Sequence, residues 1–139
     1  MTAAVESEMA TAPGQTRQLV IAIGIPTANR ASILADVLPH LEAQLRKPDH
    51  VYVCAPNPAD IPQDALAALS VQASAIIAER GLCRQRNRIL SEAAHADIVL
   101  FLDDDFLLGP GYLQALERVF LGDPSIVMCT GRVEADGIL

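Results

Sequence analysis

Three consecutive carboxylates, Asp103, Asp104 and Asp105, are the side chains in this chain best placed to do chemistry. They directly follow residues 98–102, an uninterrupted apolar run typical of a strand that is buried on both faces. In open α/β sheets, ligands bind beyond the carboxyl ends of the strands, so the acids fall where a site is expected. Adjacent like charges repel one another unless solvent, a cation or a metal ion compensates them. The alternative interpretation is a solvated acidic turn that only ends the strand.

The spacing of the outer two acids favours a metal ion. Asp103 and Asp105 are two residues apart, so in an extended segment their side chains face the same way. Mg²⁺ and Mn²⁺ prefer oxygen ligands, and one or two carboxylates hold Mg²⁺ when phosphates supply the remaining ligands. We therefore expect Asp103 and Asp105 to share one divalent cation, Mg²⁺ or Mn²⁺, with a ligand that carries phosphate.

A second cluster consists of Arg84, Arg86 and Arg88, in the first turns of a predicted helix of an otherwise acidic chain. The dipole of a helix disfavours cations at its N-terminus and favours anions, so these arginines indicate an anionic ligand or nearby acids. Arg86 lies on the predicted apolar stripe of the helix, which comprises Leu82, Ile89, Leu90 and Ala93. Contact with a ligand and a buried salt bridge to an aspartate both stay open for Arg86. Arg84 and Arg88 are expected on the solvated face, with Arg88 paired to Glu92.

The elements that must position these side chains alternate between strands and helices. Apolar runs predict five strands, at residues 19–25, 50–54, 73–78, 98–102 and 126–130. Helical spacing predicts helices at residues 32–45, 64–69 and 83–94. A further helix starts at residues 109–111 and turns inward Leu113, Leu116, Val119 and Phe120. Pro39 should kink or break the first helix. The alternation implies right-handed crossovers and an α/β fold with a mostly parallel sheet flanked by helices.

The composition narrows the class of protein. A length of 139 residues fits one domain, and 51% hydrophobic residues with only 4% aromatics indicate a core of Ala, Val, Ile and Leu. The net charge of −7 argues against a nucleic-acid partner, because phosphate backbones require clustered Lys and Arg. Lys47 is the only lysine, and its surroundings exclude a P-loop of the Gly-rich, Lys-Ser/Thr kind.

The cysteines and residues 1–18 indicate where in the cell the protein is located. Cys54, Cys83 and Cys129 are odd in number and too far apart for a short-spaced zinc motif, which favours a reducing, cytoplasmic compartment. Residues 1–18 contain no apolar block and are expected to be a disordered leader to a domain at 19–139. No apolar run approaches the about 20 residues of a transmembrane helix. A peripheral position at the inner face of a membrane stays open.

Three ordered motifs resemble the family-2 glycosyltransferases of the GT-A fold. They are Ile25-Pro26-Thr27-Ala28-Asn29-Arg30, then Gly81 with Arg86-Asn87, then Phe101-Leu102-Asp103-Asp104-Asp105. The resemblance covers roughly residues 19–133. It implies a Rossmann-like sheet of the nucleotide-diphospho-sugar transferase type. The implied activity is metal-dependent transfer of a hexosyl group, with inversion, from a UDP- or GDP-sugar to a hydroxyl of a carbohydrate or lipid-linked acceptor.

The resemblance also implies roles for individual residues. The loop containing Pro26, Thr27, Asn29 and Arg30 would lie against the nucleotide base, and Arg86 and Asn87 would lie near the base and the diphosphate. The acids correspond to the Asp-x-Asp motif of the family. Asp103 would serve the ribose, Asp105 would bind Mg²⁺ or Mn²⁺, and Asp104 would lie between them.

Two departures from the family pattern qualify these roles. After the second strand the family usually has an acidic pair followed by Gly-Ser, whereas here only Asn57 or Asp60 could contact the base. The general base of inverting members lies far beyond the Asp-x-Asp motif, so we expect it beyond Leu139, together with the acceptor-binding part of the domain. The alternative function is a non-catalytic nucleotide-binding or partner-docking module. An incomplete domain exposes apolar surface, so we also expect self-association into a homo-oligomer.

Overall fold

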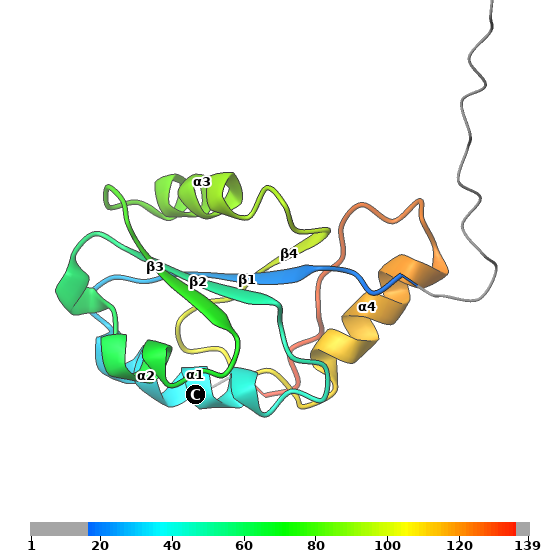
Figure 1. The fold of residues 1–139 in the computed structure, drawn as a ribbon, viewed down its shortest axis with the longest axis horizontal. Coiled ribbons are helices and arrows are strands. Elements are labelled where there is room, and N and C mark those ends of the chain that lie inside the picture. The colour runs from blue at the N-terminus through cyan, green and yellow to red at the C-terminus, as the bar shows by residue number, and fades with distance from the viewer. Residues whose placement is uncertain (1–16, 136–139) are drawn as a thin grey trace, which may run out of the picture.

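The computed structural model describes residues 17–135, which form a parallel sheet with helices on both faces (Figure 1). The strands are β1 (Ile21–Pro26), β2 (His50–Ala55), β3 (Gln72–Ile77) and β4 (Ile98–Phe101), in the spatial order β3-β2-β1-β4. The helices are α1 (Ala31–Glu42), α2 (Gln63–Ala67), α3 (Leu82–Glu92) and α4 (Tyr112–Gly122), with a 3-10 turn at η1 (Pro58–Asp60). Helices α1 and α2 cover one face and α3 covers the other, which confirms the predicted α/β fold.

The two central strands are apolar on both sides because both sides are covered. Every residue of β1 is buried, and in β2 only His50 is partly exposed. Ile21, Ile23 and Ile25 belong to a core shared with α1, whereas Ala22 belongs to a second core beneath α3. Successive side chains of a strand point to opposite faces, so a helix-covered parallel sheet requires this continuous apolar run.

Gly24 allows α3 to pack directly on β1. A Cβ atom at this position would lie 2.7 Å from Ile89 Cγ2 and 3.1 Å from Phe101 Cε1. Both distances are shorter than ordinary van der Waals contact. The separation between α3 and β1 therefore leaves no room for a side chain, which is a common reason for glycine inside a strand.

Helix α1 continues through Pro39 and ends at Glu42, so a break at this proline is not observed. Pro39 is exposed and lies in the last turn, where its missing N–H removes one hydrogen bond. Its neighbours Leu38 and Leu41 are fully buried in the core beneath α1. Their burial holds the last turn against the sheet and offsets the lost hydrogen bond.

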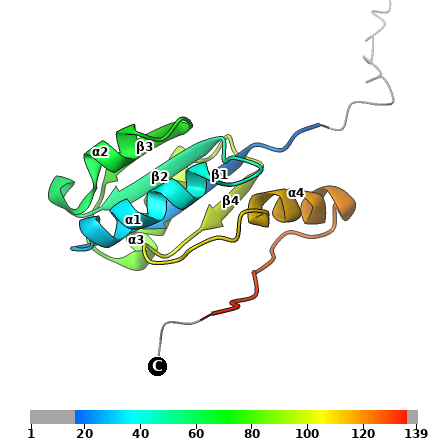
Figure 2. The same cartoon turned by 90° about the horizontal axis from the view of Figure 1, so that it is seen from below.

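The predicted fifth strand at residues 126–130 is wrong. Within the described chain this segment is irregular and follows α4 back along β4 (Figure 2). A strand requires a hydrogen-bonded neighbour, and among the described residues β4 pairs with β1 alone. Val127 and Met128 are consequently 91% and 83% exposed, and Val119 of α4 also faces solvent instead of the core. This exposed apolar surface agrees with the expected self-association, which stays a prediction.

Strand β1 is the point at which the strand order reverses. From β1 the chain adds β2 and β3 on one side and then places β4 on the other side. Open α/β sheets bind ligands at such a switch point, beyond the carboxyl ends of the two strands. The N–H of Leu102 donates to Gly24 O at 3.0 Å, which holds the start of the acidic run beside the end of β1.

Most of the predicted leader lies outside the described residues, as do residues 136–139. Arg17, near the end of that leader, forms an ion pair with Asp97 just before β4. Among residues 17–135, no helix is both long enough and apolar enough to cross a bilayer.

Candidate functional site

Thr27, directly after β1, joins three loops through its backbone and its hydroxyl. Its N–H donates to Cys54 O at the end of β2 at 2.9 Å. Its Oγ1 donates to Asp104 Oδ2, after β4, at 2.7 Å. Thr27 and Asp104 are only 4% and 6% exposed, so the hydroxyl–carboxylate bond is shielded from water. The first residue of the Thr27–Arg30 segment is therefore fixed against the acids, as the order of the motifs predicts.

Arg30 contacts two of the acids with one nitrogen. Its Nη1 donates to Asp104 Oδ1 at 2.7 Å and to Asp105 Oδ2 at 3.0 Å. The hydrogen bond to Asp104, and then that to Asp105, raises the pKa of Arg30 above its usual value. Asn29 precedes it with φ of 58°, a left-handed conformation that Asn adopts more readily than most residues. This conformation turns the chain from β1 into α1 and presents Arg30 to the acids.

The three acids lie in a turn and differ sharply in exposure. Phe106 N–H donates to Asp103 O at 3.2 Å, so the segment is not extended as the spacing argument assumed. The Asp104 side chain is 8% exposed, whereas those of Asp103 and Asp105 are 70% and 53% exposed. Both oxygens of Asp104 are occupied, by Thr27 and Arg30. The outer two acids therefore offer oxygen atoms to solvent or a ligand, and the middle one does not.

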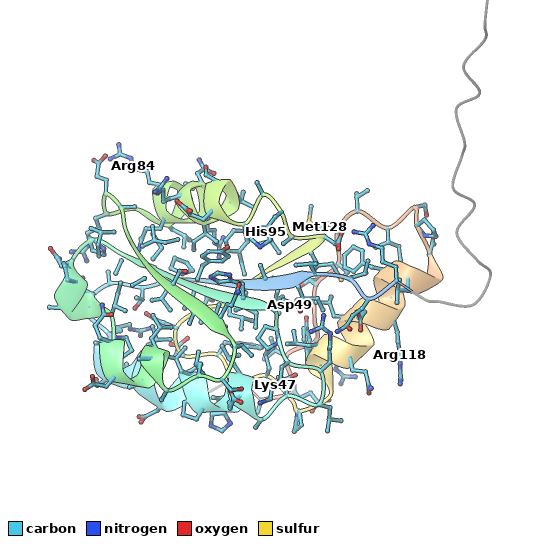
Figure 3. The ribbon with its side chains drawn as sticks, viewed as in Figure 1. Lys47, Asp49, Arg84, His95, Arg118 and Met128 are labelled. Atoms are coloured by element: carbon cyan, nitrogen blue, oxygen red, sulfur yellow. The ribbon has the colours of Figure 1, made fainter. Side chains whose placement is uncertain are left out.

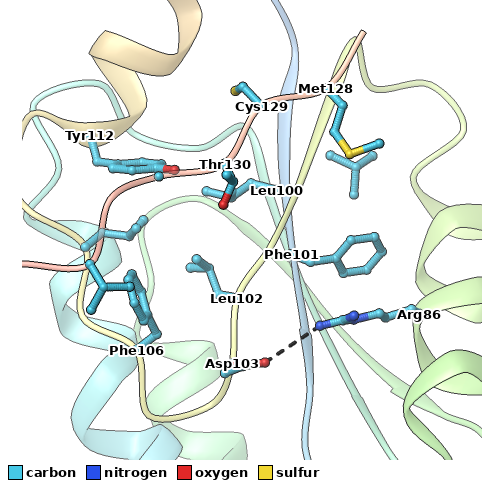
Figure 4. Close-up of a pocket in the computed structure, with 14 residues that line it drawn as sticks. Arg86, Leu100, Phe101, Leu102, Asp103, Phe106, Tyr112, Met128, Cys129 and Thr130 are labelled. Carbon is cyan, nitrogen blue, oxygen red and sulfur yellow. Dashed lines mark ion pairs between the residues drawn. The ribbon is translucent and has the colours of Figure 1, made fainter. Parts of the chain in front are cut away.

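Arg86 reaches the same site from α3. Its Nη2 lies 3.7 Å from Asp103 Oδ1, and its Cζ lies 5.4 Å from the centre of the Phe101 ring (Figure 4). Both partners of the ion pair are accessible to solvent, so this is not the buried salt bridge that was one of the two interpretations. Arg86 Nε is buried and lacks a hydrogen-bond partner among the described residues. The guanidinium thus lies over the Phe101 ring and beside Asp103, where it is accessible to solvent and could bind an anion.

The neighbouring arginines behave as expected for a solvated helix face. Arg88 Nη2 lies 2.7 Å from Glu92 Oε1, one turn along α3, which confirms the predicted pair. Arg84 forms an ion pair with Glu79 and projects from the surface at the start of α3 (Figure 3). Of the three clustered arginines, Arg86 is the one that faces the acids.

Gln85 is a buried site residue that the sequence analysis missed. It is 4% exposed, and its Nε2 donates to Thr27 O at 2.8 Å and to Cys54 O at 2.7 Å. The predicted apolar stripe of α3 is partly wrong, because Leu82 and Leu90 are 50% and 45% exposed. The buried stripe is instead spaced by four residues and consists of Gln85, Ile89 and Ala93. That spacing is the signal in the sequence that would have identified Gln85.

The loop after β2 is not joined to the acids by any hydrogen bond in the described chain. Asn57 Nδ2 donates to Asp60 Oδ2 at 3.3 Å, so the two candidates for base recognition contact each other. Asp60 is buried and Asn57 is exposed. Asn87 of α3 is exposed as well, and its carbonyl accepts from Ser91 Oγ. Asn87 thus presents an exposed side chain on α3, whereas the amide of Asn57 is held by Asp60.

The whole of this arrangement falls within one known family. The model of glycosyl transferase family 2 matches residues 22–138, a span that contains Thr27, Arg30, Arg86 and the three acids. This chain belongs to glycosyl transferase family 2. No curated protein sequence gave a match.

Several solved structures share this fold. A mannosyltransferase from Pyrobaculum calidifontis, PcManGT, solved with GDP-Man and Mn²⁺, is 24% identical with a TM-score of 0.61. TarS of S. aureus is 19% identical with a TM-score of 0.56, and covers 72% of this chain and 19% of its own. A CMP:2-keto-3-deoxy-manno-octonic acid synthetase complexed with CTP is 19% identical, with a TM-score of 0.55 over 76% of this chain and 49% of its own. The match to PcManGT covers 83% of this chain but only 36% of the mannosyltransferase.

The acids of this family 2 member suit a metal ion that takes further ligands from a substrate. Among residues 17–135, His, Cys, Asp and Glu do not gather in groups of three or more that could hold a metal ion. Mg²⁺ needs only one or two protein carboxylates when phosphates and water complete its shell. Asp103 and Asp105 expose such carboxylates on one turn. The residues present therefore fit Mg²⁺ or Mn²⁺ bound jointly with a diphosphate.

A cavity of about 510 Å³ adjoins the acids along the open edge of β4 (Figure 4). Arg86 and Asp103 line one end of it, and Tyr112 and Thr130 line the other. Its remaining lining is mostly apolar and comes from β4, the segment between β4 and α4, and the segment after α4. The cavity extends from the turn that bears the acids along the edge of β4.

Proposed function

We propose that this chain is the nucleotide-sugar-binding part of a metal-dependent glycosyltransferase that transfers a hexosyl group with inversion. The donor would be a UDP- or GDP-sugar, and the acceptor a hydroxyl of a carbohydrate or lipid-linked molecule. The observation that supports this most strongly is the bonding of Thr27 and Arg30 to Asp104 at 2.7 Å. These bonds bring the loop after β1 and the acids after β4 together at the switch point of a family 2 domain.

Different side chains would contact the base, the ribose and the diphosphate of the ligand. The loop of Pro26, Thr27 and Asn29 would lie against the base, with Asn57 opposite it across the end of β2. Asp103 would accept a hydrogen bond from the ribose. Arg86 would bind the diphosphate, because a guanidinium matches phosphate oxygens and this one stands at the N-terminal half of α3. Asn87 would supply a further donor on the same side.

The need for cations follows from the charge of the protein. The net charge of −7 repels an anionic diphosphate, and three carboxylates line the turn beside its expected position. Arg30 and Arg86 offset part of that charge at the site itself. A divalent cation at Asp105 and Asp103 would supply the rest, and it would stabilise the charge that develops on the departing diphosphate.

Isothermal titration with GDP- and UDP-sugars in the presence of Mn²⁺ tests this proposal. We expect the wild-type chain to bind a nucleotide sugar and Asp105→Asn to bind it at least about ten-fold more weakly, since one metal ligand is weakened. Asp36→Asn removes the same charge from an exposed position of α1 and serves as the control, with unchanged affinity. Absence of binding by the wild type, or equal affinity of the Asp105 variant, would contradict the proposal.

A non-catalytic nucleotide-binding or partner-docking module is the second candidate. The loop after β2 favours the non-catalytic module. This loop lacks the acidic pair that the family usually places near the base, and Asn57 and Asp60 bond to each other. The glycosyltransferase would turn over a nucleotide sugar, and the non-catalytic module would not. Release of free sugar or transfer to an acceptor, followed by mass spectrometry, would exclude the non-catalytic module, whereas nucleotide binding without turnover would favour it.

A further inference from the structure

Arg30 stands where a cation would be attracted by two carboxylates. A single nitrogen, Nη1, lies 2.7 Å from Asp104 Oδ1 and 3.0 Å from Asp105 Oδ2. A guanidinium nitrogen that bridges two carboxylates neutralises part of the repulsion between them. The acidic turn therefore carries its own counter-ion before any ligand arrives.

The two ion pairs of Arg30 differ in how readily they can open. Asp104 is buried and has Thr27 on its second oxygen, so its loss of Arg30 would leave a buried charge without compensation. Asp105 is 53% exposed, and water can replace Arg30 there. The pair with Asp104 is therefore the durable one, and the pair with Asp105 is the one that a competing cation can break.

We infer that Arg30 and a divalent cation compete for Asp105. This inference rests on the proposed function, which supplies the cation and the diphosphate. While Arg30 holds Asp105, the turn binds Mn²⁺ weakly in the absence of nucleotide. When a diphosphate is present, its oxygens compensate the metal and offer the guanidinium an alternative partner, so metal and nucleotide bind together more strongly than either does alone.

Titration of the full chain with Mn²⁺ alone, followed by electron paramagnetic resonance of the free ion, tests the competition without any nucleotide. We expect Arg30→Gln to bind Mn²⁺ about ten-fold more tightly than the wild type, because one charged hydrogen bond no longer opposes the metal. Arg30→Lys keeps the charge but cannot bridge both acids in the same way, so we expect a gain of about three-fold. Arg88→Gln removes an equal charge from the pair with Glu92 and should leave Mn²⁺ affinity unchanged.

A double variant shows whether the gain passes through Asp105. In the Asp105→Asn background, Arg30→Gln should give no gain in Mn²⁺ affinity. Unchanged or weaker Mn²⁺ binding by Arg30→Gln, with circular dichroism showing a folded chain, would overturn the inference. If Arg30→Gln does not fold, the Arg30→Lys measurement decides, and no gain there overturns it. Nucleotide-sugar binding by the wild type is a separate result, so the inference can fail while the proposed function stands.

Discussion

The loops on the two sides of β1 are built in different ways. On the β4 side, side chains far apart in the sequence bond to each other: Asp104 is 77 positions from Thr27 and 74 from Arg30. On the β2 side, the side chain of Asn57 bonds to Asp60, three positions away. Asp104 is thus held within the folded core by residues distant in the sequence, whereas Asn57 is held by a near neighbour in its own loop. The two loops should therefore respond differently to substitution.

The largest effect is expected at Asp104. Asp104→Ala removes the acceptor of the buried Thr27 hydroxyl and of Arg30. We expect the free energy of unfolding to fall by about 2–3 kcal/mol. This is a low value for a broken buried ion pair, because Arg30 is half-exposed. Urea unfolding followed by circular dichroism measures this change. Asp105→Ala is the matched control and should cost less than about 0.5 kcal/mol, because within residues 17–135 its side chain forms one exposed ion pair. Equal costs at the two positions would remove the distinction between the inner and outer acids.

A smaller effect is expected at Gln85. Gln85→Leu keeps the volume but deletes two buried hydrogen bonds to Thr27 O and Cys54 O, which should lower the free energy of unfolding by about 1.5–2 kcal/mol. Cys54 O keeps the bond from Thr27 N–H, which limits the loss. Gln63→Leu, at the exposed start of α2, is the control and should change stability little. An unchanged urea-unfolding midpoint for Gln85→Leu would mean that Thr27 O and Cys54 O accept hydrogen bonds from other donors in the variant.

The bond between Thr27 and Asp104 can be isolated by a double-mutant cycle. Thr27→Val keeps the shape of the side chain and removes the hydroxyl, at an expected cost of about 1–1.5 kcal/mol in the wild-type background. In the Asp104→Ala background the same substitution should cost nearly nothing, since its partner is already gone. Additive costs in the urea-unfolding cycle would show that the two loops are not coupled by this hydrogen bond.

The smallest effect on stability is expected on the β2 side. Asn57→Ala removes one exposed hydrogen bond to Asp60, so the free energy of unfolding should change by less than about 0.5 kcal/mol. If Asn57 contacts the base, the same substitution should still weaken nucleotide-sugar binding in the titration described above. A change in stability as large as that of Thr27→Val would contradict the difference between the two loops.

Local patterns in the sequence were sufficient for most of the fold. Apolar runs such as Ile98–Phe101 and the helical spacing in α1 and α3 depend on nearby residues, and these elements were predicted correctly, although β4 is only partly buried at the edge of the sheet. The segment at 126–130 has the composition of a strand, but a strand also needs a partner, which composition does not supply.

The site was predictable in its members but less so in its geometry. The order of the motifs indicated that Thr27, Arg30 and the acids meet, and the structure brings them together. The turn at Asp103 was missed because the two-residue spacing was taken to lie in extended backbone. Gln85 was missed because the apolar stripe was drawn through Leu82 and Leu90 and not through Gln85, and because the two carbonyls that it bonds lie 58 and 31 positions away.

Gly24 has a consequence for the candidate site, although it lies in the middle of β1 and a Cβ atom there would meet Ile89 and Phe101. Helix α3 carries both Gln85 and Arg86, so the height of this helix above the sheet determines how far the guanidinium extends over Phe101 toward Asp103. Adding one methyl group at position 24 would push α3 away from the sheet. The reach of Arg86 toward Asp103 is therefore set from below, by a residue that has no side chain of its own.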